Sequence, residues 1–401
     1  MKLTVRIQLI VMMFLMFFTW GAWYGQMGKY LFTALNATGD QIGRAYTTFS
    51  IASIVAPFFV GMIADRYFSA QKVMGVLNLI GAGILYLLIQ TKDPDLFFWY
   101  ILAYTLTFAP NLALSNSIAM NQMKDPGKEF PFIRVFGTIS WIVVTNIVGF
   151  YALGDKVDIF KISMITSVVW AIFSFTLPDT PPKSTGETSL SKILGVDAFV
   201  LFKDKSFLVF FISSVLISIP LAFYYAHANL SLTESNLSNV ENKMSFGQMS
   251  EVLFMLLIPF ALQKFGIKKM LIVGLIAWII RFIAFGYGDG ISSQWILIIG
   301  ILLHGVCYDF FFVTGQIYTD NKAGEKIKSS AQGLITLATY GIGMGIGSLL
   351  SGKVLDAYTT IQNGVTIHNW TAVWWVPAYI AMVVMLLFIL FFRDNTQKVQ
   401  N

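Results

Sequence analysis

The sequence predicts an all-α membrane protein of twelve transmembrane helices, arranged as two six-helix bundles. Three observations lead to this fold class. The 401-residue chain is 56% hydrophobic and only 12% charged, about half the charged fraction of a typical soluble domain. Its apolar stretches are long enough to cross about 30 Å of hydrocarbon, which takes about 20 helical residues. One long polar interruption lies between the sixth stretch and the seventh.

Twelve apolar stretches can each form a membrane-spanning helix. The first follows Lys2 and Arg6, as the apolar part of a secretion signal does, but it is too long and too aromatic and has no small-residue cleavage site. It is therefore predicted to remain as a span. The predicted spans are residues 7–32, 42–64, 71–91, 96–120, 131–154, 158–178, 206–232, 245–263, 269–288, 293–319, 329–352 and 370–392.

The distribution of Lys and Arg predicts the orientation of these spans. The N-terminus, the even-numbered loops and the C-terminus hold eighteen of the 27 basic residues, and the odd-numbered loops with their flanks hold seven. Because cytoplasmic loops carry the excess of Lys and Arg, both termini are expected in the cytoplasm. The same scatter over many short loops explains the net charge of +6, so no nucleic-acid partner is expected.

The polar segment 179–205 divides the chain into two halves. It predicts an N-terminal six-helix bundle over 1–178, a cytoplasmic linker over 179–205 and a C-terminal six-helix bundle over 206–401. The later part of the linker can lie on the membrane surface as a short amphipathic helix. Two parallel six-span repeats describe the major facilitator architecture, in which the substrate site lies between the halves at mid-membrane.

The loop after the second span carries a short signature. Its run Gly61-Met62-Ile63-Ala64-Asp65-Arg66 resembles the G-x-x-x-D-R loop of the major facilitator superfamily, although Phe68, Ser69 and Ala70 stand where a later Gly and Arg are usual. Gly61 permits close helix approach, and Asp65 and Arg66 can latch neighbouring helix ends. Alone, the Asp-Arg pair would be interpreted by default as a surface turn with incidental charges, but together with the span count it favours this superfamily.

Three ionisable residues lie inside predicted spans: Arg134, Glu251 and Asp309. A charge at bilayer depth costs at least about 2.5–3.5 kcal/mol on insertion scales, so such residues usually face a polar cavity or a partner. Arg134, Thr138 and Trp141 share one helical face because they are spaced i, i+4 and i+7. The sequence therefore predicts a polar site at mid-membrane.

Gln248 and Glu251 are spaced i and i+3 on the eighth span and supply an amide and a carboxylate from the other half. A carboxylate suits a sugar diol, amides suit a base edge, and an aromatic ring stacks on a base for about 1–3 kcal/mol. Trp141 and Tyr308 are the expected stacking walls. The alternative is that Arg134 and Glu251 only pair to hold the halves together and that Trp141 is packing.

Longer stretches resemble the bacterial nucleoside:proton symporter family, in order from the first span to the twelfth. They are Trp20-Gly21, Phe130–Thr138, Gly195–Phe199, Gln248–Glu251, Ala277–Phe282, Tyr308–Phe311 and Ser330–Gly333. The resemblance implies a major facilitator transporter of the bacterial inner membrane that imports nucleosides together with protons by alternating access. It also implies a cavity lined by Arg134, Glu251 and Asp309.

The chain departs from the family pattern at three positions. Ala222 and Tyr225 stand where the best-known members have a Gln and an Asn, and His304 stands where they have a Tyr. The preferred base therefore does not follow from the sequence. The substrate-binding residues are expected to be Arg134, Thr138, Trp141, Tyr225, Gln248, Glu251, His304 and Tyr308.

Asp309 is the expected proton-coupling residue, with Glu251 as its rival. Asp309 lies about 100° round the helix from Tyr308, so it can flank the site without touching substrate. The alternative is that Asp309 anchors a neighbouring helix. His304 is either a proton relay or a hydrogen-bonding replacement for the tyrosine. Arg281, in the ninth span, is interpreted as structural, outside the cavity and paired with an unidentified acceptor.

Other functional classes find little support in the sequence. It has no Gly-rich phosphate loop, no Ser/His/Asp arrangement and too few His and Cys residues for a metal site. An enzyme, an ATP-driven pump, a metal and a cofactor are therefore not expected. The remaining alternatives are a symporter for sugars or other small metabolites and, with less support, a transporter-like sensor. The protein is expected to work as a monomer in the lipid bilayer.

Overall fold

The computed structural model describes residues 2–59, 67–182 and 196–393. The chain forms two compact units, Met1–Thr188 and Ser189–Asn401, called here the first and second unit. Gly61, Asp65 and Arg66 of the loop signature lie outside the described residues, so their role as a latch stays a prediction. The same holds for the boundaries of the predicted linker 179–205, much of which is also outside.

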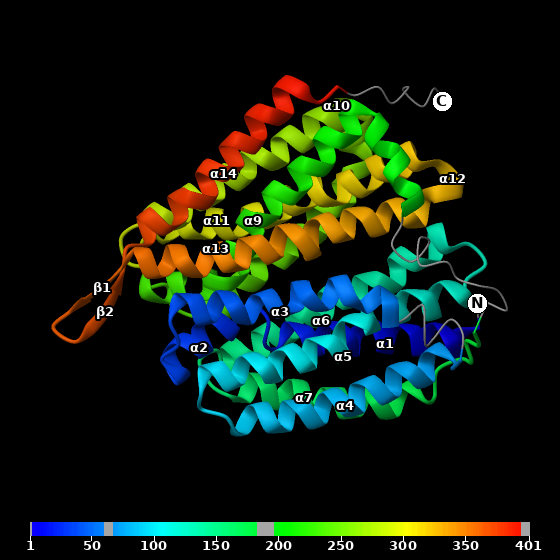
Figure 1. Ribbon diagram of the computed structural model, residues 1–401, viewed down its shortest axis with the longest axis horizontal. Helices are drawn as coiled ribbons and strands as arrows, with labels where there is room; N and C mark the ends of the chain where they lie inside the picture. The colour runs from blue at the N-terminus through cyan, green and yellow to red at the C-terminus, as the bar shows by residue number, and fades with distance from the viewer. Residues whose placement is uncertain (1, 60–66, 183–195, 394–401) are drawn as a thin grey trace. The chain divides into compact units, whose positions relative to one another are not determined.

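The first unit is a bundle of antiparallel helices (Figure 1). Its helices are α1 (Leu3–Gly21), α2 (Met27–Leu35), α3 (Gly39–Phe59), α4 (Ala70–Gln90), α5 (Pro94–Asn121), α6 (Pro126–Phe150) and α7 (Asp158–Ser174). Helix α1 packs against α6 and α7, and α5 packs against α3 and α4. The first predicted span, 7–32, is in fact broken, because the chain turns between Gly21 and Met27 before α2 begins.

The second unit continues this helical pattern. Its elements are η2 (Val196–Lys203), α9 (Lys205–Glu234), α10 (Val240–Tyr287), α11 (Gln294–Tyr308), η3 (Asp309–Val313), α12 (Thr314–Thr336), η4 (Leu337–Gly343), α13 (Met344–Ala357), β1 (Thr359–Gln362), β2 (Val365–His368) and α14 (Trp370–Phe391). Helix α9 packs against α13 and α14, and α10 packs against α11 and α14.

Two glycines break the long helices of the second unit into separate spans. Gly266 in α10 has φ of 74° and Gly324 in α12 has φ of 64°. A residue with a side chain rarely adopts this backbone conformation, so glycine permits the sharp turn. Each turn falls at a boundary between predicted spans. With these turns counted, the helices of the described residues are consistent with the twelve predicted spans.

Two helices contain short π-helical turns. In η3, which begins at Asp309, and in η4 the backbone departs from the regular α-helical ladder. Such turns are rare in proteins and are frequent at functional sites. Both turns lie in the second unit, and a hydrogen bond between the hydroxyls of Tyr308 and Tyr340, 2.7 Å apart, joins them.

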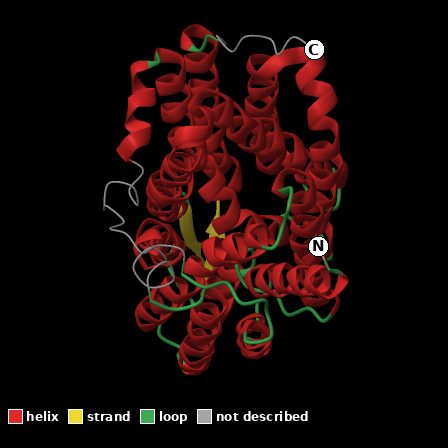
Figure 2. Cartoon of the chain, turned by 90° about the vertical axis from the view of Figure 1, so that its right-hand side faces the viewer, coloured by secondary structure: helices red, strands yellow, loops and turns green. Residues whose placement is uncertain are grey.

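A β-hairpin between α13 and α14 was not predicted. Within the described residues, β1 and β2 are the only strands (Figure 2). Asn363 and Gly364 form the turn with φ of 53° and 79°, the positive values that favour Asn-Gly in two-residue hairpins. The base of the hairpin is held by Glu234, whose Oε2 accepts from Trp370 Nε1 at 2.8 Å and lies 2.9 Å from His368 Nδ1.

The N-terminus of α9 is fixed by Asp204. Its Oδ1 accepts the N–H groups of Ser206 and Phe207, and its Oδ2 accepts Lys322 Nζ at 2.6 Å. Burial raises the pKa of Asp204, but the hydrogen bonds from Lys322 and the two N–H groups lower it more, so this pKa lies below its ordinary value. The 3-10 helix η2, which immediately precedes Asp204, packs against α12. This part of the predicted linker is thereby attached to the second unit.

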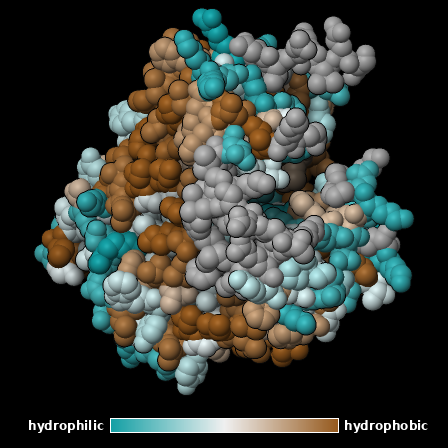
Figure 3. All heavy atoms as spheres, turned by 45° about the vertical axis from the view of Figure 1, so that its right-hand side comes forward, coloured by the Kyte–Doolittle hydropathy of each residue, from teal (hydrophilic) through white to brown (hydrophobic). Residues whose placement is uncertain are grey.

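The surface of the helices is strongly apolar. Apolar atoms cover large continuous areas of the face seen in Figure 3. Ile165, Ile172, Leu256 and Leu390 are each at least 60% exposed, and soluble monomers rarely expose large contiguous apolar patches. In the described residues, nine helical segments are long and apolar enough to cross a membrane. An integral membrane protein has this surface because lipid tails replace water around it.

Candidate functional site

The predicted face of α6 forms part of the interior of the first unit. Arg134, Thr138 and Trp141 are all half-buried. The Arg134 guanidinium carbon lies 4.0 Å from the centroid of the Phe17 ring on α1, a cation–π distance. The Trp141 ring meets Trp20 edge to face, with centroids 5.4 Å apart. Trp141 therefore has a packing role in the first unit, and its role in stacking on a base stays a prediction.

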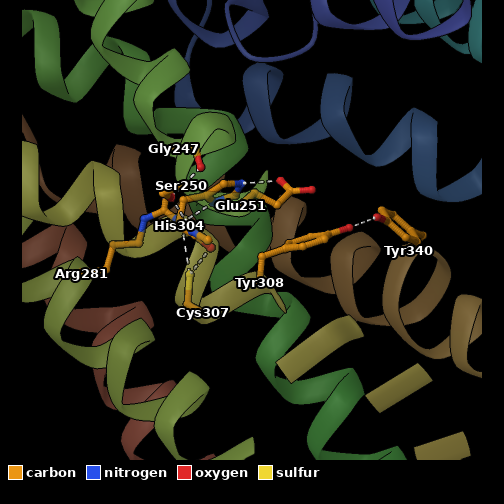
Figure 4. Close-up of polar contacts among 9 residues, drawn as sticks. Gly247, Ser250, Glu251, Arg281, His304, Cys307, Tyr308 and Tyr340 are labelled. Carbon is orange, nitrogen blue, oxygen red and sulfur yellow. Dashed lines mark hydrogen bonds and ion pairs between the residues drawn. The ribbon is translucent and has the colours of Figure 1, made fainter. Parts of the chain in front are cut away.

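Three side chains, two fully buried and one half-buried, form a polar cluster in the second unit (Figure 4). Arg281 Nη1 lies 2.7 Å from His304 Nδ1, and His304 Nε2 lies 3.7 Å from Glu251 Oε2. Arg281 and His304 are at most 1% exposed, whereas the Glu251 side chain is 17% exposed. Glu251 and Arg281 both come from α10, on either side of its turn at Gly266. Helix α11 supplies His304, which lies between them.

The acceptor of Arg281, which the sequence left unidentified, is thus His304. This contact places Arg281 beside the candidate cluster, because His304 lies between it and Glu251. The interpretation of Arg281 as structural stays a prediction. The spacing of 23 residues between Arg281 and His304 carries no signal of their contact. The contact arises because the chain reverses direction between Tyr287 and Gln294, which lays α11 alongside the second half of α10.

Aromatic rings surround this polar cluster. The Arg281 guanidinium carbon lies 3.7 Å from the centroid of the Tyr224 ring, and His304 stacks on the same ring with centroids 5.3 Å apart. Tyr225, the neighbouring residue on α9 that was expected to contact substrate, is half-buried. Gln248, also expected there, is half-buried on α10, one turn before Glu251.

Tyr308 lies one turn after His304 and is half-buried. Its ring packs between His304 and Phe312, with centroid distances of 5.7 and 5.2 Å. Its hydroxyl is hydrogen-bonded to that of Tyr340, a residue that the sequence analysis missed. The one available signal for Tyr340 was its place beside the glycine-rich run of the eleventh span. An aromatic side chain with a fixed hydroxyl is suited to the predicted stacking role.

Asp309 occupies the first position of the π-helical turn η3. Its side chain is fully buried, and neither carboxyl oxygen has a hydrogen-bond partner among the described residues. It lies within electrostatic range of Glu251. A buried carboxylate with no partner is costly, and a bound proton removes that cost. The surroundings of Asp309 therefore suit a group that takes up and releases a proton.

A close helix contact holds this cluster together. Gly305 donates its N–H to Ser250 Oγ at 3.0 Å, and a Cβ at Gly305 would lie 2.5 Å from the Ser250 carbonyl carbon and 2.6 Å from Glu251 N. Backbone atoms cannot move aside as a flexible side chain does. Glycine at this position therefore lets α11 approach α10 at the level of Glu251 and His304.

We expect Gly305→Ala to destabilise the protein by about 1–3 kcal/mol, the usual effect of overpacking a tight contact. The matched control is Gly83→Ala, because Gly83 is also helical but a Cβ there would meet nothing within 4 Å. Alanine favours helix over glycine by about 1 kcal/mol. Thermal unfolding in detergent should show a lower midpoint for Gly305→Ala and an equal or higher one for Gly83→Ala. Equal midpoints for both variants would contradict the close contact.

An apolar groove of about 420 Å³ lies elsewhere in the first unit, between α4 and α7. Its lining consists of Leu79, Ala82, Gly83, Met164, Ile165, Val168 and Val169. No side chain in this set can donate a hydrogen bond, and the one acceptor among them is the weak thioether of Met164. The groove therefore suits lipid tails, and the polar clusters on α6 and around Glu251 remain the candidate sites.

Membrane helices with ionisable groups buried inside the second unit are typical of a secondary transporter. Comparison with known proteins makes the class specific. The family model described as "Nucleoside H+ symporter" matches residues 1–397. The chain belongs to this nucleoside H+ symporter family, as its resemblance had indicated, and it has the major facilitator fold.

Individual relatives match over nearly the whole chain. "Putative nucleoside transporter YegT" of Escherichia coli (strain K12) is 42% identical, with 100% of this chain and 96% of the relative covered. "Xanthosine permease" of the same organism is 33% identical, with 98% and 97% covered. The crystal structure of the nucleoside transporter NupG is 32% identical and superposes with a TM-score of 0.87, covering 98% of this chain and 100% of that one.

Proposed function

We propose that this protein imports nucleosides together with protons by alternating access between the two sides of a bacterial inner membrane. The family match over residues 1–397 supports this activity, and three relatives at 32% identity or more are named as nucleoside or xanthosine carriers. The excess of basic residues in the even-numbered loops supports an orientation with both termini in the cytoplasm. The working unit is a monomer.

The observation that carries the proposal is the Glu251 carboxylate beside His304 and the half-buried ring of Tyr308. A carboxylate accepts hydrogen bonds from both hydroxyls of a ribose. A tyrosine ring one turn further along α11 stacks on a base. Gln248 and Tyr225 supply polar groups near the same level, and Arg134, Thr138 and Trp141 supply the contacts of the first unit.

Asp309 is the proposed proton carrier, and its charge affects the nearby carboxyl group of Glu251. Two carboxylates within electrostatic range repel each other when both are charged. Protonation of Asp309 removes that repulsion and favours a charged Glu251, which is the form that accepts hydrogen bonds from ribose. Proton loading and nucleoside binding then reinforce each other, as symport requires.

Uptake by whole cells tests the substrate class. Cells that express the protein should take up radiolabelled uridine or adenosine when the external pH is lowered, and excess unlabelled nucleoside should suppress the signal. Sucrose and maltose at the same excess should not. Suppression by the sugars, or uptake of labelled sugar in place of nucleoside, would favour the alternative of a sugar symporter.

A further inference from the structure

The contact between Arg281 and His304 fixes where the imidazole proton lies. An arginine side chain has five N–H donors and no acceptor. At 2.7 Å from Arg281 Nη1, His304 Nδ1 must therefore accept the hydrogen bond and carry no proton. A neutral imidazole has one proton, so that proton is on Nε2. This is the ring nitrogen that faces Glu251.

The Arg281 guanidinium has few polar contacts other than the one with His304. Nη1 also lies 3.5 Å from Cys307 Sγ, but Nε and Nη2 have no hydrogen-bond partner among the described residues. The guanidinium is otherwise enclosed by the rings of Tyr224, Trp278 and Phe285. A buried arginine that only stabilises a bundle is normally paired with a carboxylate. Here the strongest acceptor that it contacts is a neutral histidine.

The far side of His304 shows what this arrangement controls. Nε2–H points at Glu251 Oε2 across 3.7 Å, which is too long for a direct hydrogen bond but short enough for a strong electrostatic attraction. The opposite tautomer would present a lone pair to the carboxylate and repel it. The tautomer of His304 therefore decides whether the Glu251 side chain is held toward α11 or pushed away from it.

We propose that Arg281 is a positioning residue of the nucleoside site, which acts on Glu251 through the tautomer of His304. Arg281 holds Nδ1 as an acceptor, Nε2–H then orients the carboxylate, and the oriented carboxylate binds the ribose hydroxyls. The last step rests on the proposed function, whereas the first two do not.

The tautomer is measured by ¹⁵N NMR of the full-length protein in lipid nanodiscs, with ¹⁵N-labelled histidine. The chain has three histidines, His227, His304 and His368, so the His304 signals are those lost in His304→Tyr. The wild type should show an unprotonated Nδ1 and a protonated Nε2. Arg281→Met should give a mixture of both tautomers, and Arg281→Lys, which still offers a donor, should restore the wild-type pattern.

The wild-type spectrum alone decides the first step, whether or not Arg281→Met folds. A protonated Nδ1 in the wild type overturns the proposal. So does a spectrum of folded Arg281→Met that is identical to that of the wild type, because Arg281 would then not select the tautomer. A partner that merely fills space would leave these nitrogen shifts unchanged, so this readout separates positioning from packing.

Calorimetry with uridine tests the effect on the site. Arg281→Met should weaken uridine affinity about 10-fold in the wild-type background and by less than 2-fold in a His304→Phe background, which has no tautomer to select. Equal losses in both backgrounds would make Arg281 a structural residue and overturn the proposal. If the wild type binds no nucleoside at all, the proposed function fails, and the NMR result still decides whether Arg281 fixes the tautomer.

Discussion

Asp309→Asn is expected to abolish accumulation of nucleoside against a gradient while largely preserving nucleoside binding. The buried Asp309 carboxyl has no hydrogen-bond partner among the described residues, so an amide of the same shape breaks no such contact. Asparagine, however, cannot take up and release a proton. One proton moving across 100 mV supplies about 2.3 kcal/mol, enough for about 50-fold accumulation. The variant should lose this entire driving force.

Proteoliposomes with an imposed inward proton gradient provide the measurement. The matched control is Asp356→Asn, because Asp356 is an exposed aspartate on α13 of the same unit and its replacement should leave accumulation unchanged. Exchange of labelled for unlabelled nucleoside should survive in Asp309→Asn. Accumulation by this variant at the wild-type level would remove Asp309 from the coupling mechanism. Loss of binding as well as accumulation would instead make it an anchor between helices.

Glu251→Gln is expected to weaken nucleoside binding by about 2–5 kcal/mol, the range for removing one member of a buried charged network. That range corresponds to a loss of at least about 30-fold in affinity. Glutamine keeps the volume of glutamate, so packing between α10 and α11 is retained. It loses the charge that attracts His304 Nε2–H at 3.7 Å, together with half of the acceptor capacity for ribose.

Calorimetry on the purified Glu251→Gln variant measures the loss of nucleoside affinity. Trp141→Ala, in the first unit, is compared with it because a smaller loss is expected there. Loss of one stacking face should cost about 1–3 kcal/mol, less than loss of the charge. Arg134→Ala should fall in the same range as Glu251→Gln, because Arg134 is the charged residue among the proposed substrate contacts of the first unit. Unchanged affinity in both charge variants would reduce Arg134 and Glu251 to the pair that merely holds the halves together.

Most of the fold could be predicted because the membrane imposes a simple rule. A helix must satisfy its own backbone in hydrocarbon, so stretches such as 71–91 and 370–392 lie close to α4 and α14. Interruptions of helices within apolar stretches were harder to predict. The turn after Gly21 carries only Gly25 and Gln26 as local signals, in a stretch that is otherwise mostly apolar. The π-helical turns at Asp309 and Leu337 have no simple sequence signal.

The hairpin and the Arg281 contact were missed for opposite reasons. Asn363-Gly364 between β-branched residues is a strong local hairpin signal, and the all-α prediction overlooked it. No local signal links Arg281 to His304, because their contact depends on how α11 packs against the second half of α10. Of the expected residues of the second unit, Glu251 and Tyr308 do lie next to His304, because one face of α10 meets one face of α11 at Gly305.

The native chain can be used for site-directed thiol labelling without first removing a cysteine. Cys307 is the only cysteine in the sequence and is fully buried, and a thiol reacts only when reagent can reach it. Thr366, on the exposed β2 strand of the hairpin, offers the opposite setting. A thiol introduced there by Thr366→Cys would be the reactive one. Its capture by a maleimide that cannot cross lipid would reveal on which side of the membrane the hairpin stands.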